Sequence, residues 1–352
     1  MTFSLATEVL HLTFRDPFKI ARTEDSEASQ TVLTFLERDG AEGLGECFPV
    51  PYYGETVETT QAVLPRLVGA LDELGPLPQD RAEVLAWLER SATLMTDILG
   101  NHGGAKMGLD TALHDMAAKA QGVPIWQLIG TSDQLPPTDY SLGIDEPATV
   151  AERARRVAHF PALKIKVGGP SDIETLEAVR AVFSGPLRVD ANTGWEPEQA
   201  AALIPELDRL GVELVEQPFK ARMLPELRWL RERSSLPIMA DESAVFVDDL
   251  PMLEGVVDGV VVKLAKVGGI GPALRQIRLA RELGMKVMLG CMVESSVGVA
   301  AAAMVSSEVD WHDLDGNLLL ADDPFEGLVL GDDCRWQLPD EPGLGVRRKA
   351  RR

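Results

Sequence analysis

Two lysines end an apolar run in which charged residues are unexpected. Residues 161–169 read PALKIKVGG, and Lys164 and Lys166 flank Ile165. If this run is a buried strand, alternation places both ammonium groups on the same side of it. Like charge and partial burial both lower a lysine pKa from its usual value of ~10.4. A lysine with a lowered pKa can serve as a general base near neutral pH, so we expect Lys164 to tune Lys166 for that task.

Three carboxylates end the next three apolar runs. Asp190 occurs in LRVDANTG, Glu216 in VELVEQP and Asp241 in PIMADES. A lone aspartate at a strand end is usually a turn or a helix cap, so the prediction rests on the set. Three carboxylates that converge raise one another's pKa unless a cation joins them. Oxygen ligands without histidine or cysteine predict Mg²⁺ and argue against zinc.

A second lysine completes the pattern. Lys263 ends GVVVKLAK, the run that follows the three carboxylates, whereas Lys166 precedes them. Two bases on either side of a metal site suggest removal of a proton α to a carboxylate. The metal would stabilise the enediolate that results.

The spacing of these residues predicts the fold that positions them. Strand-end positions recur every 22 to 27 residues, at Lys166, Asp190, Glu216, Asp241, Lys263, Gly290 and Asp313. One strand and one helix need about that length, and active sites of parallel barrels form where the strands end. We therefore predict an α/β fold, a modified (β/α)7β TIM barrel over residues 121–320. An open doubly wound sheet is the alternative, although no GxGxxG follows the first strand.

Helices are predicted between the strands of the barrel. One begins at Ser171, where Glu174 three residues later gives the spacing of a capping box. Others are expected at 198–210, 224–233 and 272–283.

The first third of the chain predicts a different organisation. Strands are expected at 4–14 and 30–37, with a turn at 38–41, and helices at 56–74, 80–99 and 105–121. Strands followed by helices indicate an α+β domain. We assign residues 1–120 to this capping domain and expect residues 321–352 to pack back on it.

Composition excludes several classes of partner. The net charge of −21 argues against nucleic acid and anionic membranes. The three cysteines form no CxxC pair, no apolar run reaches the ~20 residues of a membrane span, and the start lacks the pattern of a signal peptide. We expect a cytoplasmic protein with a small-molecule substrate, and self-association into a homo-oligomer is left open.

Five motifs resemble those of a known family. LKIKVGG, RVDANTGW, VEQPF, MADES and VVKLAKVGGIG, in this order and spacing, closely resemble the enolase superfamily, muconate-lactonising subgroup. The resemblance covers nearly the whole chain, with GLGECFPVPYYGET in the capping domain. It implies that Lys166 and Lys263 are the acid/base catalysts and that Lys164 supports Lys166. The Mg²⁺ ligands it implies are Asp190, Glu216 and Asp241, and further contacts are Asn192, Lys266 and Glu242.

Residues 311–318, WHDLDGNL, point to the substrate. Two carboxylates two positions apart on a strand face the same way and can hold a cation, although a polar strand exit is the alternative reading. Asp313 and Asp315 are similar to the feature that holds the free ammonium of a dipeptide in dipeptide epimerases, and GCM at 290–292 is also similar to that group. The resemblance implies 1,1-proton transfer at the α-carbon of the C-terminal residue of L-Ala-D/L-Glu or a related L-Ala-L-Xaa dipeptide.

Two alternatives follow from the same residues. o-Succinylbenzoate synthase, N-acylamino acid racemase and muconate cycloisomerase would share the site but need no ammonium-binding carboxylates. A non-catalytic metal-binding barrel would not need both lysines.

The loop FKIARTEDSEAS bears on the side chain of the substrate. Relatives that act on Ala-Glu usually present an arginine from this loop, and matching the sequences leaves Asp25 where a second arginine would fall. Arg22 remains a candidate contact. Because Glu24 and Asp25 are acidic, the loop favours a neutral or cationic side chain.

Overall fold

A parallel sheet of eight strands forms the centre of the larger part of the molecule. The computed structural model of the chain describes residues 2–24 and 26–350. The strands are β4 (Tyr140–Leu142), β5 (Leu163–Lys166), β6 (Leu187–Asp190), β7 (Val212–Glu216), β8 (Ile238–Ala240), β9 (Gly259–Val262), β10 (Lys286–Gly290) and β11 (Trp311–Asp313), and each pairs with its neighbour in chain order. A parallel bridge between Thr138 and His312 joins the two edges. The predicted barrel fold is confirmed.

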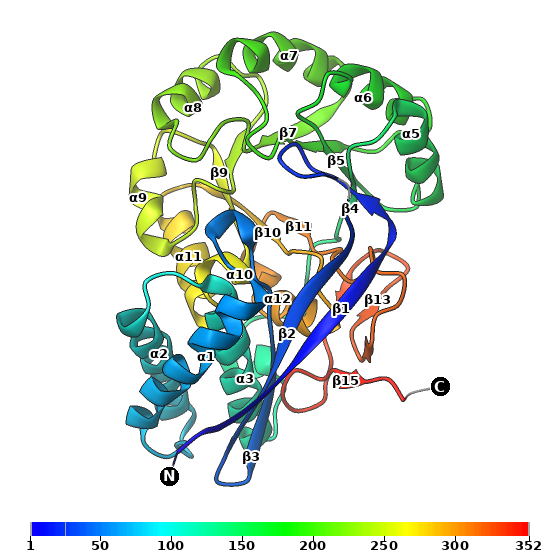
Figure 1. Cartoon of the computed structure of the whole chain (residues 1–352). Helices are drawn as coiled ribbons and strands as arrows, with labels where there is room; N and C mark the ends of the chain where they lie inside the picture. Colours follow the sequence, from blue (N-terminus) through cyan, green and yellow to red (C-terminus); the bar gives the residue numbers. More distant parts are fainter. Residues whose placement is uncertain (1, 25, 351–352) are drawn as a thin grey trace.

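Helices cover the outside of this sheet, as Figure 1 shows. They are α5 (Pro147–Arg156), α6 (Asp172–Arg180), α7 (Pro197–Arg209), α8 (Leu224–Arg231), α9 (Leu250–Leu253), α10 (Leu264–Val267), α11 (Ile270–Glu282) and α12 (Ser296–Ala303), with 3-10 turns η3 (Val247–Asp249) and η4 (Ser306–Glu308). After β11 the chain makes turns instead of a helix over residues 316–319. The interior is filled by Leu214, Met239, Val261 and Met288, which form a buried cluster with Trp311 against it.

The start of α6 differs from the prediction. Ser171 occupies the N-cap position but its side chain makes no capping hydrogen bond. The carboxylate of Asp172 instead accepts hydrogen bonds from the backbone N–H groups of Gly168 and Gly169 and from the indole of Trp195. The predicted capping box is therefore wrong, because the next residue ties down the loop that follows β5.

The N-terminal part combines a three-stranded antiparallel sheet with helices. The sheet contains β1 (Ser4–Phe18), β2 (Ser26–Arg38) and β3 (Ala41–Cys47); the helical elements are η1 (Pro51–Tyr53), α1 (Val57–Leu71), η2 (Asp72–Leu74), α2 (Arg81–Ile98), α3 (Gly103–Gln121) and α4 (Ile125–Ile129). β1 and β2 are longer than predicted, and their far ends reach the mouth of the barrel in Figure 1.

Two glycines let β3 lie directly on α3. A Cβ atom at Gly43 would lie 1.9 Å from the carbonyl oxygen of Ala112, and one at Gly45 would lie 1.9 Å from that of Gly108. No other residue type fits so close an approach of two backbones. This contact fixes the sheet against the helix that also packs on the barrel through α10.

The C-terminal segment returns to the N-terminal part. Its short strands β12 (Phe325–Glu326), β13 (Val329–Leu330), β14 (Trp336–Gln337) and β15 (Arg347–Arg348) pair as β12 with β15 and β13 with β14. Arg348 forms a salt bridge with Glu8 of β1 at 2.8 Å. Asp115 of α3 accepts hydrogen bonds from the backbone of both Leu44 and Leu344, at 2.8 and 2.7 Å.

Among the described residues, no helix combines the length and the apolar character that crossing a bilayer would require.

Candidate active site

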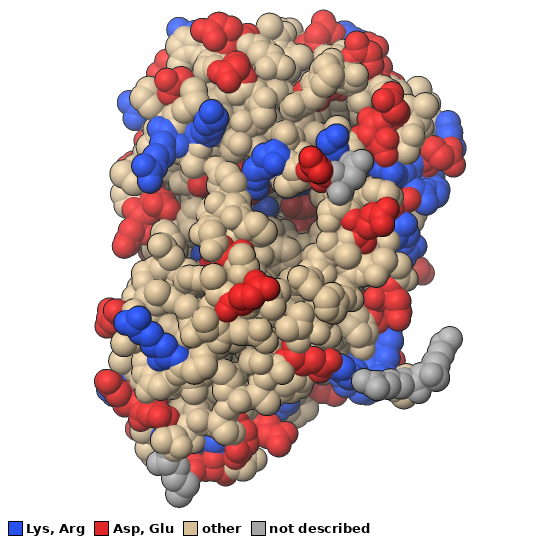
Figure 2. Space-filling model, in the orientation of Figure 1, with Lys and Arg blue, Asp and Glu red and all other residues tan. Residues whose placement is uncertain are grey.

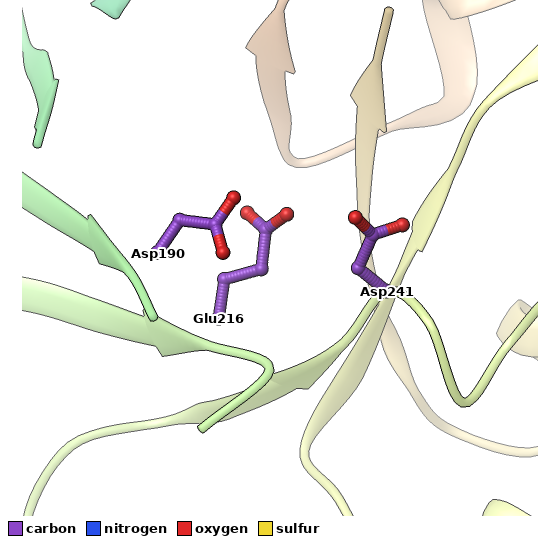
Figure 3. Close-up of side chains that lie close together, drawn as sticks. All are labelled: Asp190, Glu216 and Asp241. Atoms are coloured by element: carbon purple, nitrogen blue, oxygen red, sulfur yellow. The ribbon is translucent and has the colours of Figure 1, made fainter. Parts of the chain in front are cut away.

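Three carboxylates meet where β6, β7 and β8 end. Asp190, Glu216 and Asp241 are buried, and each offers an oxygen that lies within 4.8 Å of the others. Asp190 and Glu216 are partners in the strand register, and Asp241 directly follows β8. Figure 3 shows the three side chains pointing toward one another from neighbouring strands. The parallel sheet thus brings together residues that are 25 or 26 positions apart in the sequence.

Glu216 lies between the other two members of this carboxylate trio, and no hydrogen-bond donor reaches its two oxygens. Neither of its carboxylate oxygens accepts a hydrogen bond, although both are buried. Burial and then the charge of Asp190 raise the pKa of Glu216 to about 8. A buried carboxylate of this kind is costly unless a cation or a proton joins it. The unpartnered oxygens and the all-oxygen donor set therefore fit a hard divalent cation.

Two lysines stand at the two ends of the carboxylate trio. Lys166 of β5 donates to Asp190 at 2.6 Å, and Lys263, which follows β9, donates to Asp241 at 2.9 Å. Because β5 and β9 flank the three strands between them, the ammonium groups approach the site from opposite sides. Burial works against the charge of Lys263, but Asp241 and Glu216 outweigh it and raise its pKa. The raised pKa of Lys263 follows from the carboxylates that surround its ammonium group.

Lys164 lies beneath the site and is completely buried. Its Nζ is 2.7 Å from Oε2 of Glu216, without the geometry of a hydrogen bond, and it donates to Oδ2 of Asp313 at 2.6 Å. Burial opposes its charge, yet Asp313 and Glu216 raise its pKa well above the usual value. Lys164 thus remains a cation that links the carboxylate trio to the last strand of the barrel.

Asp313, the last residue of β11, and Asp315, two residues after it, both contact β4, so the prediction that both lie on one strand is wrong for Asp315. Asp313 accepts a hydrogen bond from the hydroxyl of Ser141 at 3.1 Å, and Asp315 accepts one from the backbone N–H of Ser141 at 2.5 Å. Burial and then Asp313 raise the pKa of Asp315 to about 6. Ser141 was absent from the predicted site. It precedes Lys166 by 25 residues, so the same interval could have identified it.

Asn192 and Lys266 each donate hydrogen bonds to one of the outer carboxylates, Asp190 and Asp241 respectively. Asn192 donates to Asp190 through its backbone N–H at 2.8 Å and its amide at 3.1 Å. Lys266 donates to Oδ1 of Asp241 at 2.5 Å and to the carbonyl oxygens of Asp241, Ala244 and Val261. All of these partners belong to the protein and the side chain is buried. The structure therefore places Lys266 behind Asp241, which differs from the substrate contact that the resemblance implied.

Arg22 reaches from the loop after β1 to the barrel. Its guanidinium forms an ion pair with Glu242, donates to the carbonyl oxygen of Asn192 at 3.2 Å, and lies 4.3 Å from the centre of the Tyr52 ring. Glu242 is almost completely buried, at 1% exposure. Asp25, the other residue predicted in this loop, lies outside the described residues.

A cavity of about 290 Å³ opens above these groups. Its barrel wall includes Ser141, Lys166, Asn192, Asp241, Lys263, Cys291, Asp313 and Asp315, and its N-terminal wall includes Phe14, Phe18, Ile20, Arg22, Phe48, Val50 and Tyr53. Figure 2 shows a hollow near the middle of this face, with basic and acidic side chains around it. The sequence analysis missed the aromatic side of the wall, because aromatic residues in a strand or turn do not distinguish a cavity wall from core.

The fold and this arrangement of groups define a class of barrel enzymes in which lysines move protons beside a carboxylate-bound cation. Residues 148–351 match the family described as enolase C-terminal domain-like, and residues 5–130 match the N-terminal domain of mandelate racemase and muconate lactonizing enzyme. The chain belongs to the enolase superfamily, as its motifs predicted.

The chain is similar to several dipeptide epimerases, and the similarity covers most of both chains. The L-Ala-D/L-Glu epimerase of Bacteroides thetaiotaomicron is 35% identical, covering 96% of this chain and 86% of the relative. A dipeptide epimerase from Enterococcus faecalis, complexed with Mg and L-Leu-L-Tyr, has a TM-score of 0.87 at 30% identity, covering 98% and 99% of the two chains. The substrate-liganded L-Ala-D/L-Glu epimerase of Bacillus subtilis has a TM-score of 0.89 at 29% identity, covering 99% and 100%.

Proposed function

We propose that this protein is a Mg²⁺-dependent dipeptide epimerase that inverts the α-carbon of the C-terminal residue of a dipeptide. The observation that carries the proposal is the placement of Lys166 and Lys263 at opposite ends of the carboxylate trio, with both lining one cavity. A carbon held between two lysines can lose its proton to one of them and regain a proton from the other on the opposite face. The configuration at that carbon then inverts.

Each lysine acts as a base for one epimer and as an acid for the other. In one direction neutral Lys166 takes the α-proton, the C–H bonding electrons move into the substrate carboxylate, and the Lys263 ammonium returns a proton. In the reverse direction the two lysines exchange these tasks. Lys164 stays protonated, because Asp313 and Glu216 contact it, and it holds these carboxylates in place.

The carboxylate trio would hold the metal ion. A divalent cation bound by Asp190, Glu216 and Asp241 supplies positive charge that stabilises the extra negative charge on the substrate carboxylate. Asn192 fixes Asp190 and Lys266 fixes Asp241, each through hydrogen bonds to the carboxylate. The rigid placement of the two outer carboxylates suits a site that must present its oxygens in one geometry.

The two aspartates at the end of β11 favour a dipeptide over the other substrates of this superfamily. Asp313 and Asp315 line the same cavity as the two lysines, and both are buried. Lys164 already contacts Asp313, whereas among the described residues no cation pairs with Asp315, so a free ammonium group of the substrate would compensate this second carboxylate. o-Succinylbenzoate synthase, N-acylamino acid racemase and muconate cycloisomerase activities offer no ammonium group at this position.

Hydrogen exchange tests the proposal directly. The protein is incubated with Mg²⁺ and a set of L-Ala-L-Xaa dipeptides in D₂O, and mass spectrometry follows deuterium at the α-carbon. Incorporation together with the appearance of the second epimer is expected. Absence of exchange with every dipeptide, in a sample that binds Mg²⁺, would exclude the epimerase and leave another activity of the subgroup or a non-catalytic binding protein. As a control, N-acetylated dipeptides lack the ammonium group and should exchange at least about tenfold more slowly.

Three further expectations belong to the same proposal. The barrel (121–320) would carry the catalytic groups, while residues 1–120 and 321–352 would supply the wall over the substrate. Cell fractionation tests the expected cytoplasmic location, and light scattering tests self-association.

A further inference from the structure

The position of the reacting carbon determines where its side chain must point. In the proposed reaction the α-hydrogen faces a lysine, the carboxylate faces the carboxylate-bound cation, and the nitrogen leads toward Asp313 and Asp315. The fourth substituent then has one direction left, away from the barrel and toward the N-terminal wall of the cavity. That wall contains Ile20, Val50 and Tyr53, and one cation, Arg22.

The cations that line the cavity differ in the groups that they already contact. Within the described part of the chain, Arg22, Lys166 and Lys263 are the cations that line it. Lys166 and Lys263 contact the carboxylate trio, so they belong to the reacting centre. Arg22 is therefore the one cation of this set that could meet an acidic side chain of the substrate.

Arg22 is held by three groups. It forms an ion pair with Glu242, donates to the carbonyl oxygen of Asn192, and stacks on the ring of Tyr52. Glu242 is almost completely buried and its second oxygen has no hydrogen-bond donor. Nη1 of Arg22 makes both hydrogen bonds, so an acidic side chain that reached Nε or Nη2 would share this one cation with buried Glu242, which is unfavourable for two like charges. The ion pair thus presents no net charge to the cavity.

Much of the rest of the wall is apolar, although Thr23, Ser26 and Ser29 also line the cavity. Ile20, Val50 and Tyr53 face the cavity beside Arg22, and Phe48 and Pro51 extend the same surface. Apolar side chains gain free energy on this surface, whereas an uncompensated carboxylate loses its hydration there.

We infer that Glu242 neutralises the charge of Arg22, so that the enzyme selects dipeptides whose C-terminal residue is apolar and rejects those in which it is acidic. This inference rests on the proposed function and names its substrate class. Arg22 and Glu242 together determine specificity, and neither is needed to move the proton.

The test compares matched dipeptides in wild-type protein. kcat/KM for deuterium exchange is measured for L-Ala-L-Met, L-Ala-L-Gln and L-Ala-L-Glu at saturating Mg²⁺. We expect the Met dipeptide to exceed the Glu dipeptide by about 100-fold and the Gln dipeptide to exceed it by about tenfold. A preference for Glu would overturn the inference and leave the epimerase function intact. Absence of exchange with any dipeptide would overturn the proposed function, and this inference with it.

Two variants then test whether Glu242 neutralises the charge of Arg22. Glu242→Gln keeps the shape but frees the charge of Arg22, so the Gln-to-Glu ratio of kcat/KM should fall about tenfold. Glu152→Gln is the matched control, because it removes the carboxylate of an exposed ion pair with Arg155 outside the cavity lining, and the ratio should change less than about twofold. An unchanged Gln-to-Glu ratio of kcat/KM in Glu242→Gln would overturn the inference that Glu242 neutralises Arg22.

A double variant covers the case in which Glu242→Gln loses all activity. Arg22→Met/Glu242→Gln removes both charges of the pair at once. If the pair is neutral toward the substrate, the Gln-to-Glu ratio stays within about threefold of wild type. A rise of about tenfold or more would show that Arg22 contacts the acidic side chain in wild type, which contradicts the inference.

Discussion

Both ends of the barrel interior contain buried charges, but they are arranged differently. At the end where the strands begin, Arg188 of β6 donates to Asp139 at 2.8 Å and to Glu213 at 2.9 Å, and the indole of Trp311 donates to Glu213. At the other end, two residues along the same strand, Asp190 meets Glu216 and Asp241. Asp139 has one oxygen without a donor, whereas Glu216 has two.

The comparison teaches that buried charge by itself does not mark a functional site. Around Arg188 one cation lies between carboxylates and bonds to both, so the group is complete within the protein. Around Glu216 the acceptors face one another beside a cavity, and the group needs a ligand to complete it. Four predictions test this difference, in order of decreasing expected effect.

Loss of either site lysine should lower turnover far more than stability, because Lys164 and Lys266 still contact Asp190 and Asp241. Lys166→Ala and Lys263→Ala are each expected to lower kcat for epimerisation by about 10³-fold, the scale of general acid–base catalysis. Each variant should lose α-proton exchange from one epimer far more than from the other, measured in D₂O. Lys286→Ala, at an exposed position near the beginning of β10, is the control and should retain wild-type rates. Equal loss for both epimers would contradict the two-base arrangement.

Loss of Arg188 should lower the stability of the protein and leave its turnover nearly unchanged. Arg188→Met leaves Asp139 buried without its cation, so the free energy of unfolding should fall by about 3 kcal/mol while kcat of the folded protein stays within about threefold. Urea denaturation and steady-state kinetics at low temperature measure the two quantities. Arg209→Met removes an arginine whose ion pairs are exposed, and it should cost less than about 0.5 kcal/mol. A large loss of kcat without loss of stability would place Arg188 in the site.

Magnesium should stabilise the wild type through Glu216. At 100 times its dissociation constant, a ligand that binds the folded state adds about 2.7 kcal/mol of stability. We expect a rise in Tm with Mg²⁺ in wild type and a far smaller rise in Glu216→Gln, which keeps the shape of the side chain but loses its charge. EDTA should return wild type to its metal-free Tm. An equal rise in both proteins would exclude Glu216 as a ligand.

Glu294, a buried carboxyl group beside Glu46, should make stability depend on pH. Burial and then Glu46 raise the pKa of Glu294 to about 8, from 4.5. Between these values the folded state holds a proton that the unfolded state has released, so stability falls as pH rises toward 8. The slope should be about 1.4 kcal/mol per pH unit more negative in wild type than in Glu294→Gln, measured by denaturation from pH 5 to 8. Identical slopes in both proteins would contradict the assignment.

Much of the barrel could be read from the sequence because its signal is periodic. A polar residue at the end of each apolar run fixes the strand register, and parallel pairing then places Lys166 opposite Asp190 and Asp190 opposite Glu216. The carboxylate trio therefore follows from local pattern and barrel topology alone.

Contacts between distant segments could not be read in the same way. The pairing of Arg22 with Glu242 joins positions 220 residues apart, and no periodicity relates a loop of the N-terminal part to a loop of the barrel. The expected tuning of Lys166 by Lys164 also missed that carboxylates contact both ammonium groups. Ser171 does not cap α6, and Asp172, next to it, accepts a hydrogen bond from the backbone of the loop after β5 instead.

The hydrogen bonds of Asp115 constrain the order in which the protein can be completed during synthesis. Its carboxylate joins Leu44, which is translated before the barrel, to Leu344, which is translated after it. The N-terminal part is therefore translated before the barrel but is completed only after the barrel has emerged. Until then β1 lacks the backbone hydrogen bonds that join Thr13 and Arg15 to Ala321 and Leu319, and a truncated or stalled chain would present that edge to other chains.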